Sequence, residues 1–406
     1  MKLPLRNLNT WRSAGLFFVC LILISCGLFP KLVESITATA TAPNPPTNAT
    51  ALASGSAGST SMPAPEMSET TGPYSLTISN SYPLPLANGV LGLSMTASPG
   101  KVWLGTGNGT IEQVDSQSGA FVQSIPLITG EGLGYYLVPT LEFNGQYIAA
   151  LEITRDLKSL NLFAVEPGSG KVVHQWDMQS PEWSEESRMF TSTVLGVSPG
   201  KIWVDGHVID TQVFDVKKVS MLPMTRFGYN GKGWMWITGD SGGSCDDLVF
   251  VNTDDLSEVV CQPRLPFLVE PNHVYPDVSI MALAGDRMWM VTGGEGGGQP
   301  LTITAYPADM DQLMKEMKPL AKVTLMDESH QIKMLYAGNY LWLLWMAGDK
   351  RGFLYQLDPQ TGETINSLDL VGNQGRSKGD IPRDMATEGK NLWIVTMFQL
   401  LRIQLP

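Results

Sequence analysis

Charged residues are scarce in this chain of 406 residues, and positively charged residues are the scarcer kind. Only 16% of the residues are charged whereas 43% are hydrophobic, a composition that excludes bulk disorder and a long coiled coil. Lys and Arg total 27 against 39 Asp and Glu, so the formal net charge is −12. Because no Lys/Arg cluster interrupts this acidic balance, the basic surface that binds a phosphate backbone is missing. We therefore expect no nucleic-acid partner.

The apolar run near the N-terminus, Leu16–Ser25, is too short to span a bilayer comfortably. It follows three positively charged residues, Lys2, Arg6 and Arg12. A positive segment before a short apolar run is typical of a cleaved secretion signal. A short N-terminal transmembrane anchor is the alternative interpretation.

The end of this run, Leu23-Ile24-Ser25-Cys26, resembles the lipobox of bacterial lipoproteins. The resemblance implies that residues 1–25 are a signal peptide and that Cys26 carries a diacylglyceryl group and further acyl chains such as palmitate. Two or more acyl chains anchor a protein stably. The protein is then expected at the extracytoplasmic face of the cell membrane, or at the outer membrane if the envelope has one. Loss of three cations and no anion makes the mature net charge −15.

Cysteine is rare, with four residues, and only Cys245 and Cys261 lie beyond the N-terminal segment. An isolated pair in an oxidising compartment predicts a disulfide bond. Two separate buried thiols are the alternative. Zinc binding is disfavoured because neither residue has a CxxC partner.

A second segment with few charges or aromatic residues lies between the signal and the rest of the chain. Ala, Thr, Ser, Pro and Gly dominate Thr37–Gly72, which therefore cannot bury enough apolar surface to fold. We expect residues 26–73 to be a lipidated Cys followed by a flexible tether. Residues 74–406 then form the folded domain.

The folded part repeats one sequence unit. Each unit has a turn Gly and an apolar–aromatic pair, then further short apolar runs separated by polar turns such as Asp115–Gly119 and Asp358–Gly362. These runs are rich in β-branched and aromatic residues, as strands are, and the turns are of the kind that closes hairpins. The aromatic markers are Trp103, Tyr147, Trp203, Trp236, Trp289, Trp342 and Trp393.

The spacing of these markers, about one per 40–50 residues, is the length of a propeller blade. The sequence therefore predicts an all-β fold, a β-propeller of about seven four-stranded blades, which we expect to be monomeric. A β-sandwich or two smaller barrels would not explain a Trp recurring at the start of the same strand. The last repeat is one strand short, so Tyr74–Leu86 should supply its outermost strand and close the ring. Only Asp309–Glu316 has a helical pattern.

Gly389-Lys-Asn-Leu-Trp393 and Asp358-Pro-Gln-Thr-Gly362 resemble the repeats of quinoprotein-like and YVTN-type bacterial β-propellers. The resemblance covers residues 74–406 and implies an architecture without a function, because these propellers host enzymes, binding proteins and assembly scaffolds. Trp176 ends one repeat as in quinoprotein motifs, but the other blades do not repeat it. No cofactor is therefore expected.

Most unusual residues fall in the connections that a propeller places on one face. Long loops with aromatic and charged side chains on a rigid scaffold are typical binding sites, and variable solvated loops are the alternative. We predict a non-catalytic protein that binds a protein or glycan there. A metal-dependent lyase or lactonase and a scaffold subunit of an envelope assembly are the other hypotheses. The candidate binding residues are Tyr135, Tyr136, Trp183, His273, Tyr275, Arg376 and Arg383.

Three of the four histidines, His207, His273 and His330, also fall in or beside this face. Imidazoles from neighbouring blades could hold a divalent metal at the channel mouth. They show no HxH or HxxxH spacing, so three unrelated histidines are the favoured interpretation. A catalytic carboxylate pair cannot be selected from so many acidic residues.

Overall fold

The computed structural model divides the chain into two compact units, Met1–Glu69 and Thr70–Pro406. The residues that the structure describes all belong to the second unit. They are 76–84, 93–107, 109–127, 140–153, 160–178, 195–204, 206–219, 224–239, 248–262, 281–291, 301–316, 318–326, 331–347, 351–371 and 381–406.

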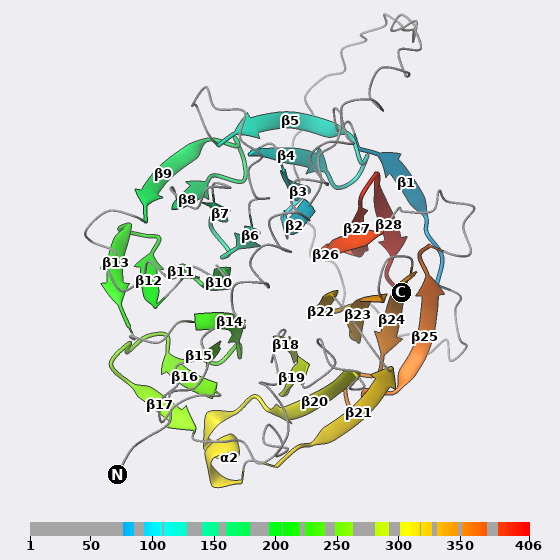
Figure 1. Cartoon of the computed structure of the whole chain (residues 1–406). Helices are drawn as coiled ribbons and strands as arrows, with labels where there is room; N and C mark the ends of the chain where they lie inside the picture. Colours follow the sequence, from blue (N-terminus) through cyan, green and yellow to red (C-terminus); the bar gives the residue numbers. More distant parts are fainter. Residues whose placement is uncertain are drawn as a thin grey trace, which may run out of the picture. The chain divides into compact units, whose positions relative to one another are not determined.

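Seven four-stranded antiparallel sheets form the blades of a β-propeller, as the repeats predict (Figure 1). Blades 1 to 3 are β2 (Leu93–Ser98), β3 (Lys101–Thr106), β4 (Thr110–Asp115) and β5 (Phe121–Pro126); β6 (Thr140–Phe143), β7 (Ile148–Ile153), β8 (Leu160–Val165) and β9 (Val172–Asp177); and β10 (Leu195–Ser198), β11 (Lys201–Val204), β12 (His207–Asp210) and β13 (Asp215–Lys218). The first strand of each blade contacts the first strand of the next, so these strands are innermost.

Blades 4 to 7 continue the ring with the same strand order. They are β14 (Met224–Tyr229), β15 (Trp234–Gly239), β16 (Leu248–Asn252) and β17 (Val259–Gln262); β18 (Met281–Ala284), β19 (Arg287–Val291), β20 (Leu301–Pro307) and β21 (Ala321–Met326); β22 (Gln331–Ala337), β23 (Tyr340–Ala347), β24 (Arg351–Leu357) and β25 (Thr364–Asp369); and β26 (Pro382–Glu388), β27 (Asn391–Thr396) and β28 (Gln399–Gln404) with β1 (Asn80–Pro83).

The N-terminal strand closes the ring as expected. β1 pairs antiparallel with β28, from Asn80 opposite Arg402 to Pro83 opposite Gln399. The Arg402 guanidinium donates to the Asn80 side chain and to the Gln117 carbonyl of blade 1, and it lies 6.0 Å from the Tyr82 ring centroid. β1 therefore joins the two ends of the folded chain and covers the edge of blade 7.

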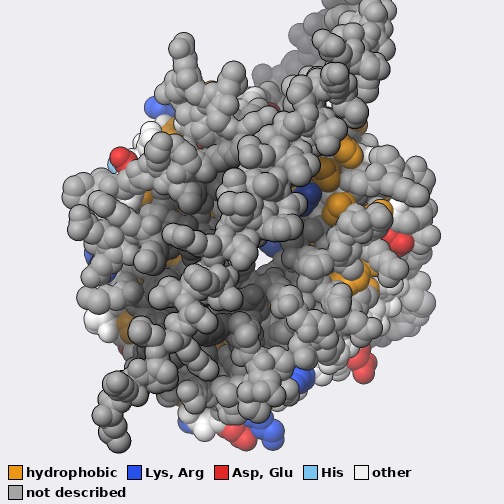
Figure 2. Space-filling model, viewed as in Figure 1, with side chains coloured by type: hydrophobic (Ala, Val, Ile, Leu, Met, Phe, Trp, Pro, Cys, Tyr) orange, Lys and Arg blue, Asp and Glu red, His pale blue; other side chains and the backbone are white. Residues whose placement is uncertain are grey.

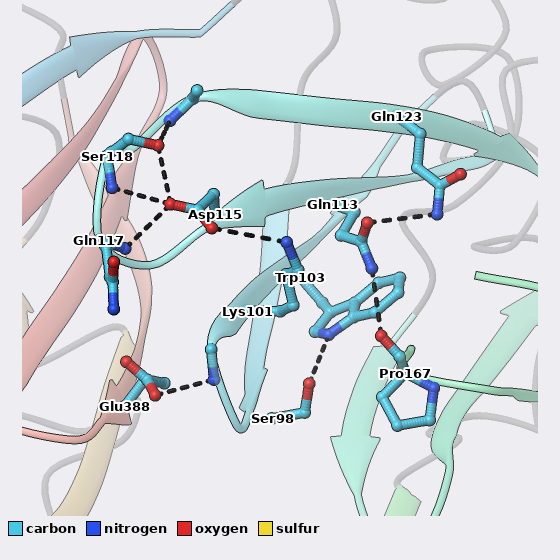
Figure 3. Close-up of polar contacts among 12 residues, drawn as sticks. Ser98, Lys101, Trp103, Gln113, Asp115, Gln117, Ser118, Gln123, Pro167 and Glu388 are labelled. Carbon is cyan, nitrogen blue, oxygen red and sulfur yellow. Dashed lines mark hydrogen bonds and ion pairs between the residues drawn. The ribbon is translucent and has the colours of Figure 1, made fainter. Parts of the chain in front are cut away.

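The core lies between the blades because the second strand of each blade is largely apolar on both faces. All six marker tryptophans are fully buried. Trp103 of blade 1 packs with Ile148 and Phe163 of blade 2, and its Nε1 donates to Ser98 Oγ at 2.9 Å (Figure 3). Each large ring thus fills the space to the next blade. The indole N–H groups have acceptors in Trp103, Trp203, Trp289 and Trp342, whereas those of Trp236 and Trp393 are buried without a partner among the described residues.

Blade 2 departs from this pattern, and the expectation that Tyr147 replaces the Trp is wrong in detail. Ile148 pairs with Val165 as Val102 pairs with Val114, so Ala149 is the structural counterpart of Trp103. Phe214, from the next blade, supplies the missing bulk. Its ring stacks on His174 at 4.7 Å and lies 5.8 Å from Trp176.

The polar turns between the third and fourth strands hold themselves together (Figure 3). Asp115 Oδ1 accepts hydrogen bonds from the Ser118 backbone N–H at 2.9 Å, its hydroxyl at 2.8 Å and the Gln117 N–H at 3.2 Å. These bonds, above all the Ser118 backbone bond, lower the pKa of Asp115 to about 2. Gly119 closes the turn at φ +71°, where an added Cβ would meet the Tyr82 ring. Gly is therefore required here both for its φ and for its size.

The predicted helix is α2 (Met310–Lys315), which lies in the connection between β20 and β21. Asp309 caps it by accepting from the Gln312 N–H. No helix among the described residues is long and apolar enough to cross a membrane.

Candidate functional site

The two faces of the propeller differ in the lengths of their connections. Strand direction alternates within a blade, so the connections from second to third strand and from blade to blade join strand ends on one face. That face carries the long connections 127–139, 178–194 and 263–280, whereas turns such as Pro99-Gly100 close the other. We call it the long-connection face.

An ion-paired group crosses the centre of the ring. Lys333 Nζ of β22 lies 3.4 Å from Asp384 Oδ1 of β26 and 3.7 Å from Glu142 Oε1 of β6. The other oxygen of Asp384 accepts from the Met95 N–H of β2 at 2.8 Å. The group therefore links innermost strands of blades 6, 7, 1 and 2, of which blades 6 and 2 are not neighbours. Figure 2 shows basic side-chain atoms close to the central opening.

The electrostatics of this group favour a structural role for the lysine. Attraction by Asp384, and then by Glu142, raises the pKa of Lys333 above its ordinary range despite partial burial. Burial raises the pKa of Glu142, which Lys333 opposes. Since the amine stays protonated near neutral pH, Lys333 is a poor nucleophile and a poor general base.

Glu152, the fifth residue of β7, is the most unusual acidic residue of the described part. It has no solvent exposure, and neither carboxylate oxygen has a hydrogen-bond partner among the described residues. Burial raises its pKa to about 7. Its strand end lies on the long-connection face, next to the connection that leads into β8.

The structure describes only some of the residues singled out from the sequence. Arg383 lies in β26 beside Asp384, partly buried, and its Nε is buried without a partner among the described residues. His207 is buried at the start of β12, and Cys261 lies in β17 opposite Val249. The remaining candidates lie outside the described residues, and the roles assigned to them stay predictions: Cys26, Tyr135, Tyr136, Trp183, Cys245, His273, Tyr275, His330 and Arg376.

Sequence reasoning missed Lys333, Glu142 and Glu152. Each is a charged residue inside a short apolar run, and that interruption was the available signal. Among the described residues, no three or more His, Cys, Asp or Glu side chains lie close enough together to hold a metal ion.

These features define a seven-bladed β-propeller closed by an N-terminal strand. No protein-family model matches the chain, and no curated protein does. A chain from the crystal structure of the mitotic checkpoint complex is similar, with a TM-score of 0.53 and 10% identity, over 85% of this chain and 97% of that one. BamB from Moraxella catarrhalis gives a TM-score of 0.45 and 13% identity, over 82% of this chain and 98% of the BamB chain. The likeness to the first concerns the fold alone.

Proposed function

We propose that this protein is a lipid-anchored, extracytoplasmic propeller that binds a protein or a glycan through its long-connection face, without catalysis of its own. The observation that carries the proposal is the difference between the faces. The two longest connections, 178–194 and 263–280, join strand ends on one face, whereas short turns close most of the other, apart from the connection 308–320 that contains α2. A rigid ring with variable segments on one side is suited to recognition.

The candidate aromatic residues provide the test of this face. Tyr136 and Trp183 lie in two long connections, and their replacement by Ala should weaken partner binding while leaving the melting temperature nearly unchanged. Photo-crosslinking in living cells from position 136, and a glycan array with the purified protein, would identify a protein or a glycan ligand respectively.

Tyr336 offers a matched control. It is 37% exposed at the end of β22 that leads into a short turn, on the opposite face. Tyr336→Ala and crosslinking from position 336 should leave the ligand signal unchanged. Equal loss from both faces, or strong destabilisation by the Tyr136→Ala, Trp183→Ala pair with unimpaired binding, would contradict the proposal.

The anchor is tested separately. Cys26→Ala should abolish incorporation of labelled palmitate and release the protein from the membrane or leave it as unprocessed precursor. Labelling and membrane retention equal to those of the wild type would end the lipoprotein hypothesis, whereas Cys20→Ala should change neither.

A further inference from the structure

Glu152 lies on the face of blade 2 that packs against blade 1. Side chains alternate along a strand, so Glu152 shares a side of β7 with Ile148 and Ala150. Both of these belong to a buried cluster with Trp103, Ile111 and Phe163. The carboxyl group thus ends a row of apolar side chains at the junction of blades 1 and 2.

Among the described residues, no charged group compensates this carboxyl group. Burial is the one contribution to its raised pKa, and both of its oxygens lack partners among the described residues. Glu112 of blade 1, by contrast, accepts from Thr110 at 3.0 Å and from Ser124 at 2.7 Å. An unsatisfied buried carboxyl group is unfavourable and calls for a specific explanation.

The chemistry of the junction selects the kind of ligand. Hard metal ions require several oxygen ligands, whereas the residues of β7 on the same side as Glu152 are apolar and its neighbour across the sheet is the single amide Asn161. Two free oxygens on one carboxylate match the two parallel N–H donors of a guanidinium group. The aliphatic stem of an arginine would in turn pack against apolar walls. The acidic net charge of the chain also favours a basic partner.

We propose that the junction of blades 1 and 2 receives an arginine side chain of a protein partner, with Glu152 as its ion-pair acceptor. This inference rests on the proposed function and specifies the chemistry of the partner. The connection between the two blades, which contains Tyr135 and Tyr136, begins and ends beside this junction, at Leu127 and Leu141 of the same apolar cluster. Because Glu152 is fully buried, insertion requires a local opening, so association should be slower than for a preformed site.

The probe is N-acetyl-arginine methylamide, titrated into the purified full-length chain and followed by calorimetry and by NMR. The neutral citrulline analogue has the same shape without the charge and should not bind. The bound guanidinium requires an ionised carboxylate, so the affinity of the wild type should rise about tenfold between pH 6 and pH 8, because the ionised fraction of a group with a pKa of about 7 rises by that factor.

Glu152→Gln keeps the shape and should weaken probe binding at least tenfold and abolish its pH dependence. Glu112→Gln is the matched control and should leave both unchanged. Melting curves of the two variants confirm that each is folded. Absence of probe binding to the wild type at millimolar concentration and pH 8, or equal binding by Glu152→Gln, would overturn the inference. Probe binding without any partner on the long-connection face would support the site and count against the proposed function alone.

Discussion

Lys333 and Glu152 are both ionisable residues inside strands, and they differ in whether an opposite charge lies nearby. Lys333 lies within 4 Å of two carboxylates, so its ammonium group is compensated. Glu152 has no compensating charge in the part of the chain that the structure describes, and burial holds it in its neutral form up to about pH 7. A buried residue with a pKa near 7 makes stability depend on pH where other carboxyl groups have finished titrating.

Replacing Glu152 by Gln should remove this dependence. Folding raises the pKa of Glu152 from its ordinary value of 4.5 to about 7. The protonated carboxyl group is therefore compatible with the folded state below pH 4.5, and the unfolding free energy falls as pH rises from 4.5 to about 7. The loss amounts to about 3 kcal/mol. Wild type and Glu152→Gln should therefore differ little in unfolding free energy at pH 4.5, and the variant should be the more stable at pH 8. Urea unfolding measures both free energies, and a difference between the two proteins that stays constant from pH 4.5 to pH 8 would contradict the buried, uncompensated carboxyl group.

At the scale of strands and turns, blade 2 shows how a missing ring is replaced. The last residue of the turn is Gly in blades 1, 2 and 6, and Gly362 lies against the Trp289 ring of the blade before it. In blade 3 this position is occupied by Phe214, at φ +56°. Phe214 packs against blade 2, in which Ala149 takes the place of the marker Trp. The strained backbone of Phe214 is offset by the aromatic contacts it gains.

This exchange predicts a compensating pair of substitutions. Phe214→Gly should lose about 3 kcal/mol of packing, partly offset by relief of strain. Ala149→Trp should destabilise by about 1–3 kcal/mol through overpacking against Phe214. The double variant restores the Trp–Gly arrangement that Trp289 and Gly362 form between blades 5 and 6, and it should be more stable than either single variant. Chemical denaturation of the wild type, the two single variants and the double variant measures the coupling free energy between positions 149 and 214. Strictly additive effects would show that one large side chain does not substitute for the other.

The repeat pattern of the sequence was sufficient to predict the blades and the turn glycines, because each repeat is complete within about 50 residues. The closing strand could be predicted because the last repeat lacks one strand and would otherwise leave an unpaired edge. Ala149 was not recognised, because the position of a strand residue is set by pairing and not by its distance from a turn Gly. The Lys333–Glu142 pair could not be predicted from the sequence because these residues come from non-adjacent blades. The role of Glu152 depends on burial, which its sequence neighbours do not reveal.

At the scale of the whole ring, stability should depend on β1 more than on the segment before it. Deleting Tyr74–Leu86 removes the Tyr82–Trp393 contact at 5.9 Å and exposes β28, which should lower the unfolding free energy by at least about 3 kcal/mol. Deleting Thr37–Gly72 should leave it unchanged. Calorimetry of the two truncated proteins distinguishes them, and equal melting temperatures would refute the closing role of β1.

The position of β1 also determines how the propeller would respond to mechanical force. β1 is the first strand after the N-terminal segment, so a pull on that segment acts on Leu76, which packs in the cluster between blades 6 and 7, and then on the β1–β28 ladder. The loaded end is the one where Ser79 N–H donates to the Arg402 carbonyl at 2.8 Å and the Arg402 guanidinium also binds blade 1. Peeling must therefore first release Leu76 from blades 6 and 7 and then break the contacts of Arg402, which connects β28 to both β1 and blade 1.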